Sequence, residues 1–297
     1  MRLRTTLAAS LALVLLGSAS TASAYCRTRG CNDQTQDCTY DSDGCLTAGK
    51  LLHWGSGCIS FGVQRDGSPR RSISYDAAHA AIVDAFSEWL SADCGGGVGP
   101  GVQILDYGPV ECHEAEYNQD APNANIFMFR DESWPYENAI DTLALTTLIF
   151  NADTGEIYDA DVEVNTFESP MSLGATGRAD IDFHSVITHE IGHFLGLSHS
   201  NQPGATMRPS YAPGNTSMAS IEPDDVAGIC AALPPGREVR TNSCEPRHGF
   251  SSECGVPDTS CSFSPGSAGG APSAALLALL GLSSLLRRRP RPSNRRP

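Results

Sequence analysis

The chain has 297 residues, with 34 aspartates and glutamates against 20 lysines and arginines, so its formal net charge is −14. Because nucleic acids bind clustered positive charge, this balance argues against a nucleic-acid partner. The 11 cysteines are typical of an exported, disulfide-bonded protein, and their odd number leaves one of them unpaired within the chain. Their connectivity does not follow from the sequence.

Both ends of the chain differ from its body. Residues 1–24 combine two arginines, an apolar stretch and Ala22-Ser23-Ala24, which predicts a signal peptide cleaved after Ala24. A second apolar run at 271–286 precedes a cluster of arginines and is shorter than the roughly 20 residues that span a membrane. This tail resembles the myxobacterial C-terminal sorting signal, a short hydrophobic helix that is a transient membrane anchor, with Cys261 at the processing site. An ordinary single-span anchor is the alternative.

Composition divides the chain into five segments. A cysteine-rich segment at 25–50 has almost no apolar periodicity, and the polar, cysteine-containing composition returns after Pro234-Pro235. The predicted segments are a signal peptide at 1–24, a cysteine-rich segment at 25–50, one main domain at 51–235, a linker at 236–262 and a sorting or anchor tail at 263–297. This layout predicts a protein that is secreted or attached to the outer cell surface.

The main domain begins with alternating strand and helix signals. Short runs of β-branched and aromatic residues predict strands at 58–63, 72–75, 102–107 and 125–130. An apolar stripe at helical spacing predicts a helix at 76–90, with Asp76 as its N-cap.

The second half of the main domain begins with a predicted hairpin. Its strands, at 143–150 and 158–165, flank the turn Asp153-Thr154-Gly155. The second strand alternates acidic with small or apolar residues, which predicts a half-solvated edge strand that can pair with an extended peptide. Further helices are predicted at 182–195 and from residue 223 or 224 to 233.

The run His-Glu-Ile-Gly-His-Phe-Leu-Gly-Leu-Ser-His that begins at His189 predicts a catalytic zinc site. His189 and His193 lie one helical turn apart, so both imidazoles can bind one ion. Gly196 lets the chain leave the helix, which brings His199 back as the third ligand. Glu190 can reach a metal-bound water without becoming a ligand. Three protein ligands leave the fourth position to water or substrate.

This run resembles the zinc helix of the matrixin branch of the metzincin peptidases. Met207 lies in Gly-Ala-Thr-Met-Arg-Pro-Ser-Tyr, which is similar to the family's Met-turn, and residues 224–229 resemble its final helix. By this resemblance, which covers roughly residues 51–235, Met207 forms an apolar floor beneath the three imidazoles. Arg208 stands where vertebrate matrixins carry an aromatic residue, which changes the expected shape of the adjoining specificity pocket.

The resemblance implies an α+β metzincin catalytic domain. Such a domain has a twisted, mostly parallel sheet with an antiparallel edge strand, a long backing helix and a zinc-binding active-site helix. The activity implied is zinc-dependent hydrolysis of peptide bonds in extracellular proteins, with Glu190 assisting the attack of zinc-bound water. The expected substrate is extended polypeptide paired with the strand at 158–165, and we expect a monomer.

Two further motifs leave alternatives open. Cys254 lies in Cys-Gly-Val-Pro-Asp, which resembles the matrixin cysteine switch, in which a thiolate occupies the open zinc position; a disulfide is the alternative. Four acids supply oxygen ligands suited to calcium, whereas a solvated strand and turn would also carry them. These acids are Asp153, Asp159, Asp161 and Glu163.

A non-catalytic, metal-containing surface module for binding or adhesion is the alternative to the peptidase. Glu190 discriminates between the two functions, because metal binding alone does not need this residue. An exported inhibitor or signalling factor carried by the cysteine-rich segments has no positive motif.

Overall fold

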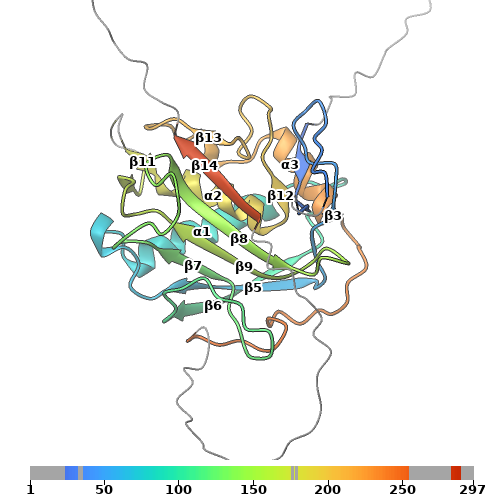
Figure 1. The fold of residues 1–297 in the computed structure, drawn as a ribbon, viewed down its shortest axis with the longest axis horizontal. Helices are drawn as coiled ribbons and strands as arrows, with labels where there is room; N and C mark the ends of the chain where they lie inside the picture. The colour runs from blue at the N-terminus through green and yellow to red at the C-terminus, as the bar shows by residue number, and fades with distance from the viewer. Residues whose placement is uncertain (1–23, 33–35, 175–176, 178–179, 254–281, 289–297) are drawn as a thin grey trace, which may run out of the picture.

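The computed structural model describes residues 24–32, 36–174, 177, 180–253 and 282–288. An eight-stranded sheet runs through the middle of the molecule (Figure 1). Its strands are β4 (His53–Trp54), β5 (Cys58–Gln64), β6 (Gln103–Val110), β7 (Ile126–Phe129), β8 (Thr142–Phe150), β9 (Glu156–Val164), β13 (Ser210–Tyr211) and β14 (Leu282–Arg288).

Three α-helices, two 3₁₀-helices and several two-residue strands complete the described elements. The 3₁₀-helices are η1 (Pro69–Arg71) and η2 (Ser217–Ala219). The α-helices are α1 (Tyr75–Leu90), α2 (Phe183–Phe194) and α3 (Pro223–Ala232). The short strands are β1 (Cys26–Arg27), β2 (Arg29–Gly30), β3 (Lys50–Leu51), β10 (Met171–Ser172), β11 (Ile181–Asp182) and β12 (Leu197–Ser198).

The order across the sheet is β13-β14-β8-β9-β7-β5-β6, and β4 also pairs with β9. Strands β5, β6, β7 and β9 are parallel to their neighbours in this group, whereas β8 is antiparallel to β9. The expected α+β architecture, with a mostly parallel sheet and an antiparallel strand towards one edge, is therefore confirmed.

The hairpin of β8 and β9 confirms the predicted pair of strands but corrects their roles. Asn151 Oδ1 accepts hydrogen bonds from the backbone N–H groups of Asp153 and Thr154, and Gly155 has a φ of +83°, so a side-chain-capped turn reverses the chain. The predicted edge position of the strand at 158–165 is wrong. Strand β9 lies between β8 and β7, and its acids at 159, 161 and 163 are at most 2% exposed.

Helix α1 is the long backing helix, and its beginning also differs from the prediction. Ser74 rather than Asp76 caps it, because the Ser74 hydroxyl accepts a hydrogen bond from the backbone N–H of Ala77. The strand predicted at 72–75 is wrong as well. Ser72 has a φ of 57°, which interrupts an extended strand, and Ile73 forms only an isolated bridge with Ser68.

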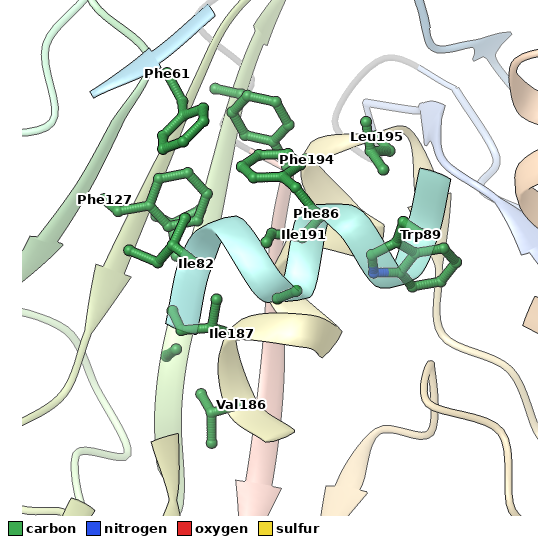
Figure 2. Packing of buried hydrophobic residues seen from close by; sticks show 14 of the residues in the cluster. Phe61, Ile82, Phe86, Trp89, Phe127, Val186, Ile187, Ile191, Phe194 and Leu195 are labelled. Atoms are coloured by element: carbon green, nitrogen blue, oxygen red, sulfur yellow. The ribbon is translucent and has the colours of Figure 1, made fainter. Parts of the chain in front are cut away.

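Helices α1 and α2 pack together on one face of the sheet (Figure 2). Phe61 and Phe127 of the sheet meet Phe86 of α1 and Phe194 of α2, with ring centroids between 4.8 and 5.8 Å apart. Aromatic pairs at these separations add to the free energy of burial. The Trp89 indole N–H also donates to the Thr188 carbonyl of α2 at 2.8 Å. The core therefore fixes the position of α2.

Four disulfides join described residues. They are Cys26–Cys45, Cys31–Cys38, Cys58–Cys244 and Cys94–Cys230, and Cys112 is also disulfide-bonded. The third bridge ties the segment after α3 to the start of β5, and the fourth ties α3 to the end of α1. Bridges that close long loops restrict the unfolded chain most strongly.

The segment at 282–288 forms strand β14, which is antiparallel to β8 and parallel to β13. The sequence predicts part of a short hydrophobic helix here, whereas the structure shows an extended strand; residues 271–281 lie outside the described residues. The open side of β8 offers backbone N–H and C=O groups that an extended segment can pair with. Among the described residues, no helix is long and apolar enough to cross a membrane.

Candidate active site

Helix α2 carries the first two predicted zinc ligands. Asp182 caps its beginning by accepting a hydrogen bond from the Ser185 backbone N–H at 2.9 Å. His189 and His193 lie one turn apart and are at most 1% exposed. After the helix ends, Gly196 adopts a φ of +100°, a conformation that side chains with a Cβ avoid. The chain then turns back, and His199 reaches the same place.

The three imidazoles converge. Their ring centroids are 4.7, 4.8 and 5.3 Å apart, and the Nε2 atoms of His189 and His193 are 3.1 Å apart. One ligating atom from each ring lies within 4.8 Å of the others. Two nitrogens on one tetrahedral zinc lie about 3.3 Å apart, so these residues fit the ion. In the part of the chain that the structure describes, no other group of His, Cys, Asp or Glu meets this criterion.

The surroundings hold the buried rings in the form that binds metal. His189 Nδ1 donates to the Thr206 carbonyl at 2.6 Å, and His193 Nδ1 donates to the Leu197 carbonyl at 2.8 Å. Since a carbonyl only accepts, the proton lies on Nδ1 and the Nε2 lone pair points inward. Burial lowers the pKa of His193 to about 4 and, together with the neighbouring histidines, lowers that of His189 well below its usual value.

Glu190 lies beside these ligands on α2 and is completely buried. Its Oε2 accepts a hydrogen bond from the Thr146 hydroxyl of β8 at 2.6 Å, while its Oε1 has no hydrogen-bond partner among the described residues. Burial raises the pKa of Glu190 to about 8, although the Thr146 bond acts in the opposite direction. A nearby cation would favour the ionised carboxylate. The site thus contains a proton acceptor with one free oxygen.

Met207 lies against α2, and its role as an apolar floor beneath the three imidazoles remains a prediction. A Cβ added to Gly192 would overlap the Met207 sulfur and lie 2.8 Å from the Trp89 ring, so only glycine leaves room between the two ligands of α2. The turn around Met207 is held by Asp225, whose carboxylate accepts hydrogen bonds from the backbone N–H groups of Thr206 and Met207 at 2.8 and 3.1 Å. Burial raises the pKa of Asp225.

Sequence reasoning did not identify Thr146, Gly192 or Asp225. By resemblance, Asp225 belongs to the final matrixin helix at 224–229, which gives its side chain no role at the site. It does close a capping box with Glu222, but its bonds to the Met-turn bridge 18 and 19 residues. The contact of Thr146 with Glu190 spans 44 residues and has no local signal.

The strand that contacts Glu190 is β8, through Thr146. Thr146 of β8 is the Cα partner of Ser284 in β14, and Tyr211 of β13 is the partner of Arg288. An extended segment therefore runs antiparallel to β8 and parallel to the strand that follows the Met-turn. Because Thr146 contacts Glu190, a segment that pairs with β8 at Thr146 lies near the proton acceptor.

The structure does not bring together the four acids proposed for calcium. Asp153 is exposed in the hairpin turn, whereas the other three are buried on β9. Both oxygens of Glu163 are engaged, one by the Arg130 guanidinium at 2.6 Å and the other by the Tyr136 hydroxyl at 2.6 Å. Burial raises the pKa values of Asp159 and Asp161 well above the usual range. Only these two remain as neighbouring candidate ligands.

Cys254, the candidate for a thiolate switch, lies outside the described residues. The residues just before it lie beside the far edge of the sheet, where the Ser252 carbonyl accepts a hydrogen bond from the Glu111 backbone N–H at 2.7 Å. Strand β6, which ends at Val110, is the strand furthest from β8. The switch remains a prediction.

A mostly parallel sheet, a helix with two histidines, a third histidine after a glycine turn and a buried methionine against that helix define a domain with a three-histidine metal site. Comparison with known proteins shows which peptidase family this domain resembles. Residues 105–232 match the model of the matrixin peptidase family, and this part of the chain is matrixin-like.

Individual relatives support this assignment. The chain is 35% identical to metalloendoproteinase 1-MMP of Arabidopsis thaliana over 109 residues, which cover 37% of this chain and 28% of that one. It is 35% identical to human matrilysin over 99 residues, 33% of this chain and 34% of the relative. A shorter match to human neutrophil collagenase is 49% identical over 53 residues, 18% and 11% of the two chains. The matches thus span about a third or less of these relatives.

Proposed function

We propose that this chain is an exported zinc-dependent endopeptidase that hydrolyses peptide bonds of extracellular proteins. The observation that carries the proposal is the completely buried Glu190 beside three convergent imidazoles. One of its oxygens is held by Thr146, and the other has no hydrogen-bond partner among the described residues. This is the arrangement that a general base requires.

The mechanism follows from the positions of these side chains. Zinc bound by His189, His193 and His199 supplies a Lewis acid and lowers the pKa of water towards roughly 7. Thr146 holds Glu190 Oε2, which leaves Oε1 to accept the proton of the attacking water. Glu190 then delivers this proton to the leaving amine. Because the carboxyl group is desolvated, it needs little reorganisation during the reaction.

Extended polypeptide is the substrate that this site favours. The edge of β8 accepts a strand, because β14 already pairs with it over residues 142–148. Substrate would use the same backbone groups of β8, and such β-augmentation provides affinity without requiring a particular sequence. The register brings a chain in this position past Thr146 and hence past Glu190.

A non-catalytic surface module is the second candidate, and Glu190 argues against it. A buried carboxyl group without a cationic partner destabilises a fold, and a protein that only holds metal gains nothing from it. Side chains of strongly perturbed pKa in such positions are typical of active sites.

The remaining parts of the proposal rest on the sequence. The predicted signal peptide at 1–24 supports export, and the predicted tail at 263–297 supports secretion or attachment to the outer surface. Both segments lie largely outside the described residues. We propose that the protein acts as a monomer, and that calcium, where it binds, uses Asp159 and Asp161.

Replacing Glu190 by glutamine tests the proposal. Glu190→Gln keeps the shape of the side chain and an acceptor for Thr146 but removes the base, so we expect kcat to fall by about 10²- to 10⁴-fold with zinc content unchanged. Glu137→Gln, at an exposed position, is the matched control. Cleavage of a denatured protein substrate by wild type, both variants and chelated wild type is the measurement. Equal cleavage by Glu190→Gln and wild type would disprove the assigned base.

A further inference from the structure

The cysteine-rich N-terminal segment lies alongside the chain that leads to the third histidine. Strand β1 is antiparallel to β12, with Cys26 opposite Ser198 and Arg27 opposite Leu197. The Thr28 backbone N–H continues this pairing by donating to the Gly196 carbonyl at 2.9 Å. The N-terminal segment therefore pairs with residues 196–198, which connect the end of α2 to His199.

Thr28 also contacts the group that orients His193. Its hydroxyl donates to the Leu197 carbonyl at 2.7 Å, and the same oxygen accepts the hydrogen bond from His193 Nδ1 at 2.8 Å. Thr28 is only 2% exposed, so water does not replace this bond. Because a carbonyl oxygen has two lone pairs, both donors are satisfied at once. Thr28 thus holds the Leu197 carbonyl in place, and this carbonyl orients the His193 imidazole.

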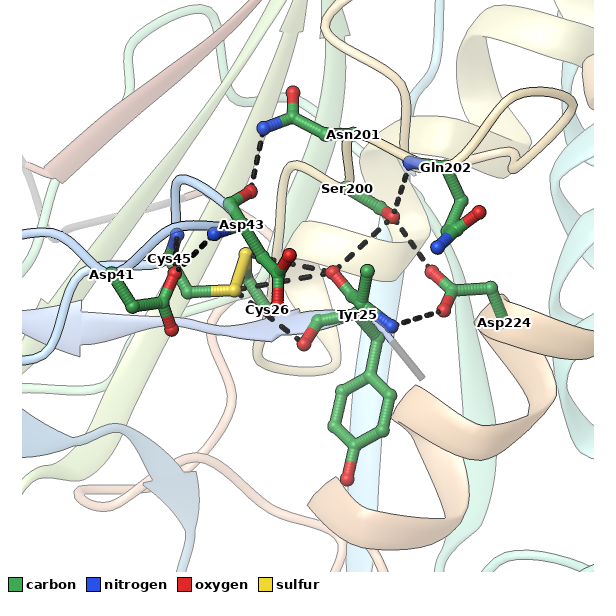
Figure 3. The surroundings of a disulfide bond; sticks show 10 residues. Tyr25, Cys26, Asp41, Asp43, Cys45, Ser200, Asn201, Gln202 and Asp224 are labelled. Carbon is green, nitrogen blue, oxygen red and sulfur yellow. Dashed lines mark hydrogen bonds between the residues drawn. A yellow bond between two sulfur atoms is a disulfide. The ribbon is translucent and has the colours of Figure 1, made fainter. Parts of the chain in front are cut away.

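Several links hold the N-terminal segment in place (Figure 3). The Cys26–Cys45 disulfide closes the loop in which Asp43 lies, and the Asp43 carbonyl accepts a hydrogen bond from the Asn201 side chain. On the other side, the Leu52 backbone N–H donates to the Thr28 carbonyl at 2.9 Å. The strand is thus tied both to the loop after His199 and to the main domain.

We infer that Thr28 is a positioning residue for zinc, held in register by the Cys26–Cys45 loop. Its hydroxyl keeps the Leu197 carbonyl on His193 Nδ1 and keeps the segment before His199 in place. Without it, the ring of His193 and the position of His199 are less restricted, so zinc leaves more readily. The inference rests on the zinc site of the proposed function but not on peptide hydrolysis.

The test compares Thr28→Val with Thr28→Ser in the full chain. Valine has the shape of threonine without the hydroxyl, whereas serine keeps the donor. We expect zinc to be lost to a competing chelator about tenfold faster from Thr28→Val, the low end of the effect of removing partners of metal ligands, and at the wild-type rate from Thr28→Ser. The visible spectrum of the cobalt-substituted protein should change only in Thr28→Val.

A second threonine provides the control for general loss of stability. Thr166 is also buried, and its hydroxyl donates to Asp131 instead of the zinc site. Thr166→Val should lower the melting temperature without changing zinc release. The double variant Cys26→Ser/Cys45→Ser, which keeps Thr28 but loosens its strand, should release zinc faster than wild type and provides a test even where Thr28→Val does not fold.

The outcomes separate this inference from the proposed function. Wild-type zinc release and an unchanged cobalt spectrum in both Thr28→Val and the double cysteine variant would overturn the inference, while cleavage by wild type would leave the peptidase standing. Faster zinc release from Thr28→Val in a protein that cleaves no peptide would support the inference and count against the peptidase. A wild-type protein that retains no zinc would refute both.

Discussion

Two clusters of buried ionisable side chains lie on opposite faces of the sheet and have opposite surroundings. On the face that α2 covers, three imidazoles converge and Glu190 keeps an oxygen without a hydrogen-bond partner among the described residues. On the other face, Glu163 is enclosed by Arg130 and Tyr136, and Asp161 accepts a bond from the backbone N–H of Ile126. Burial alone therefore does not identify a functional site. The histidine cluster is identified as the candidate site because ligating atoms of three side chains converge there.

Arg130 provides the largest expected difference between the two clusters. Arg130→Met removes the cation from Glu163, which is 0% exposed, so we expect the free energy of unfolding to fall by about 3–5 kcal/mol. Urea denaturation measures this change. Zinc content should not change, because the pair lies on the opposite face from the imidazoles.

The double variant Arg130→Met/Glu163→Gln is its control. Removing both charges leaves no unpaired ion at position 163, so most of the lost stability should return. A double variant as unstable as Arg130→Met would mean that packing of the arginine stem, and not the charge, holds this face together.

Asp159 and Asp161 predict a dependence of stability on pH. Burial raises both pKa values, so between the ordinary aspartate pKa of about 3.9 and the raised values the unfolded chain loses protons that the folded chain keeps. Stability should therefore fall as pH rises through this window. Asp159→Asn should reduce the slope by about 1.4 kcal/mol per pH unit, measured by urea denaturation at a series of pH values.

Calcium sharpens the same experiment. Calcium bound to this pair would favour the ionised carboxylates, so adding it to wild type should remove the fall in stability, and adding it to Asp159→Asn should have little effect. An identical pH dependence of wild type and Asp159→Asn, with and without calcium, would show that the pair does not titrate as its burial implies.

Replacing Thr146 tests the contact that holds Glu190, and replacing the neighbouring Thr147 is the control. Thr146→Val removes the hydrogen bond that holds Glu190, so we expect kcat to fall about tenfold, less than the loss of the base itself, while zinc content stays constant. Thr147 follows Thr146 on β8 and pairs with Asp161 of β9. Because successive side chains of a strand point to opposite faces, Thr147→Val alters the face of the sheet opposite the imidazoles. A similar loss of kcat in both variants would show that the effect comes from the strand and not from the contact with Glu190.

The two clusters also show where sequence reasoning succeeds. His189, His193 and Glu190 are separated by a few residues on one helix, and Gly196 marks the turn to His199, so spacing alone predicts their convergence. The roles of β8 and β9 depend on which of the two strands lies inside the sheet, and spacing does not show this. The alternating acids of β9 predict a solvent-exposed face, whereas the structure places Arg130 and Tyr136 against Glu163 there. Thr28 meets Leu197 across 169 residues, and no local pattern reports such a contact.

Strand β14 occupies the position next to β8 that the proposed substrate needs, which predicts the smallest effect. A strand that belongs to the same chain is present at an effective concentration on the order of 1 mM, so a strand that binds with a dissociation constant near 1 mM raises the apparent KM about twofold. We would place a recognition sequence for a specific protease at 263–270 of the full chain, cut the folded protein and remove the released segment. The cut protein should show a lower KM and faster hydrogen exchange at β8, because the N–H groups that paired with β14 become open to water. Unchanged KM and exchange would show that β14 does not compete with substrate for this edge.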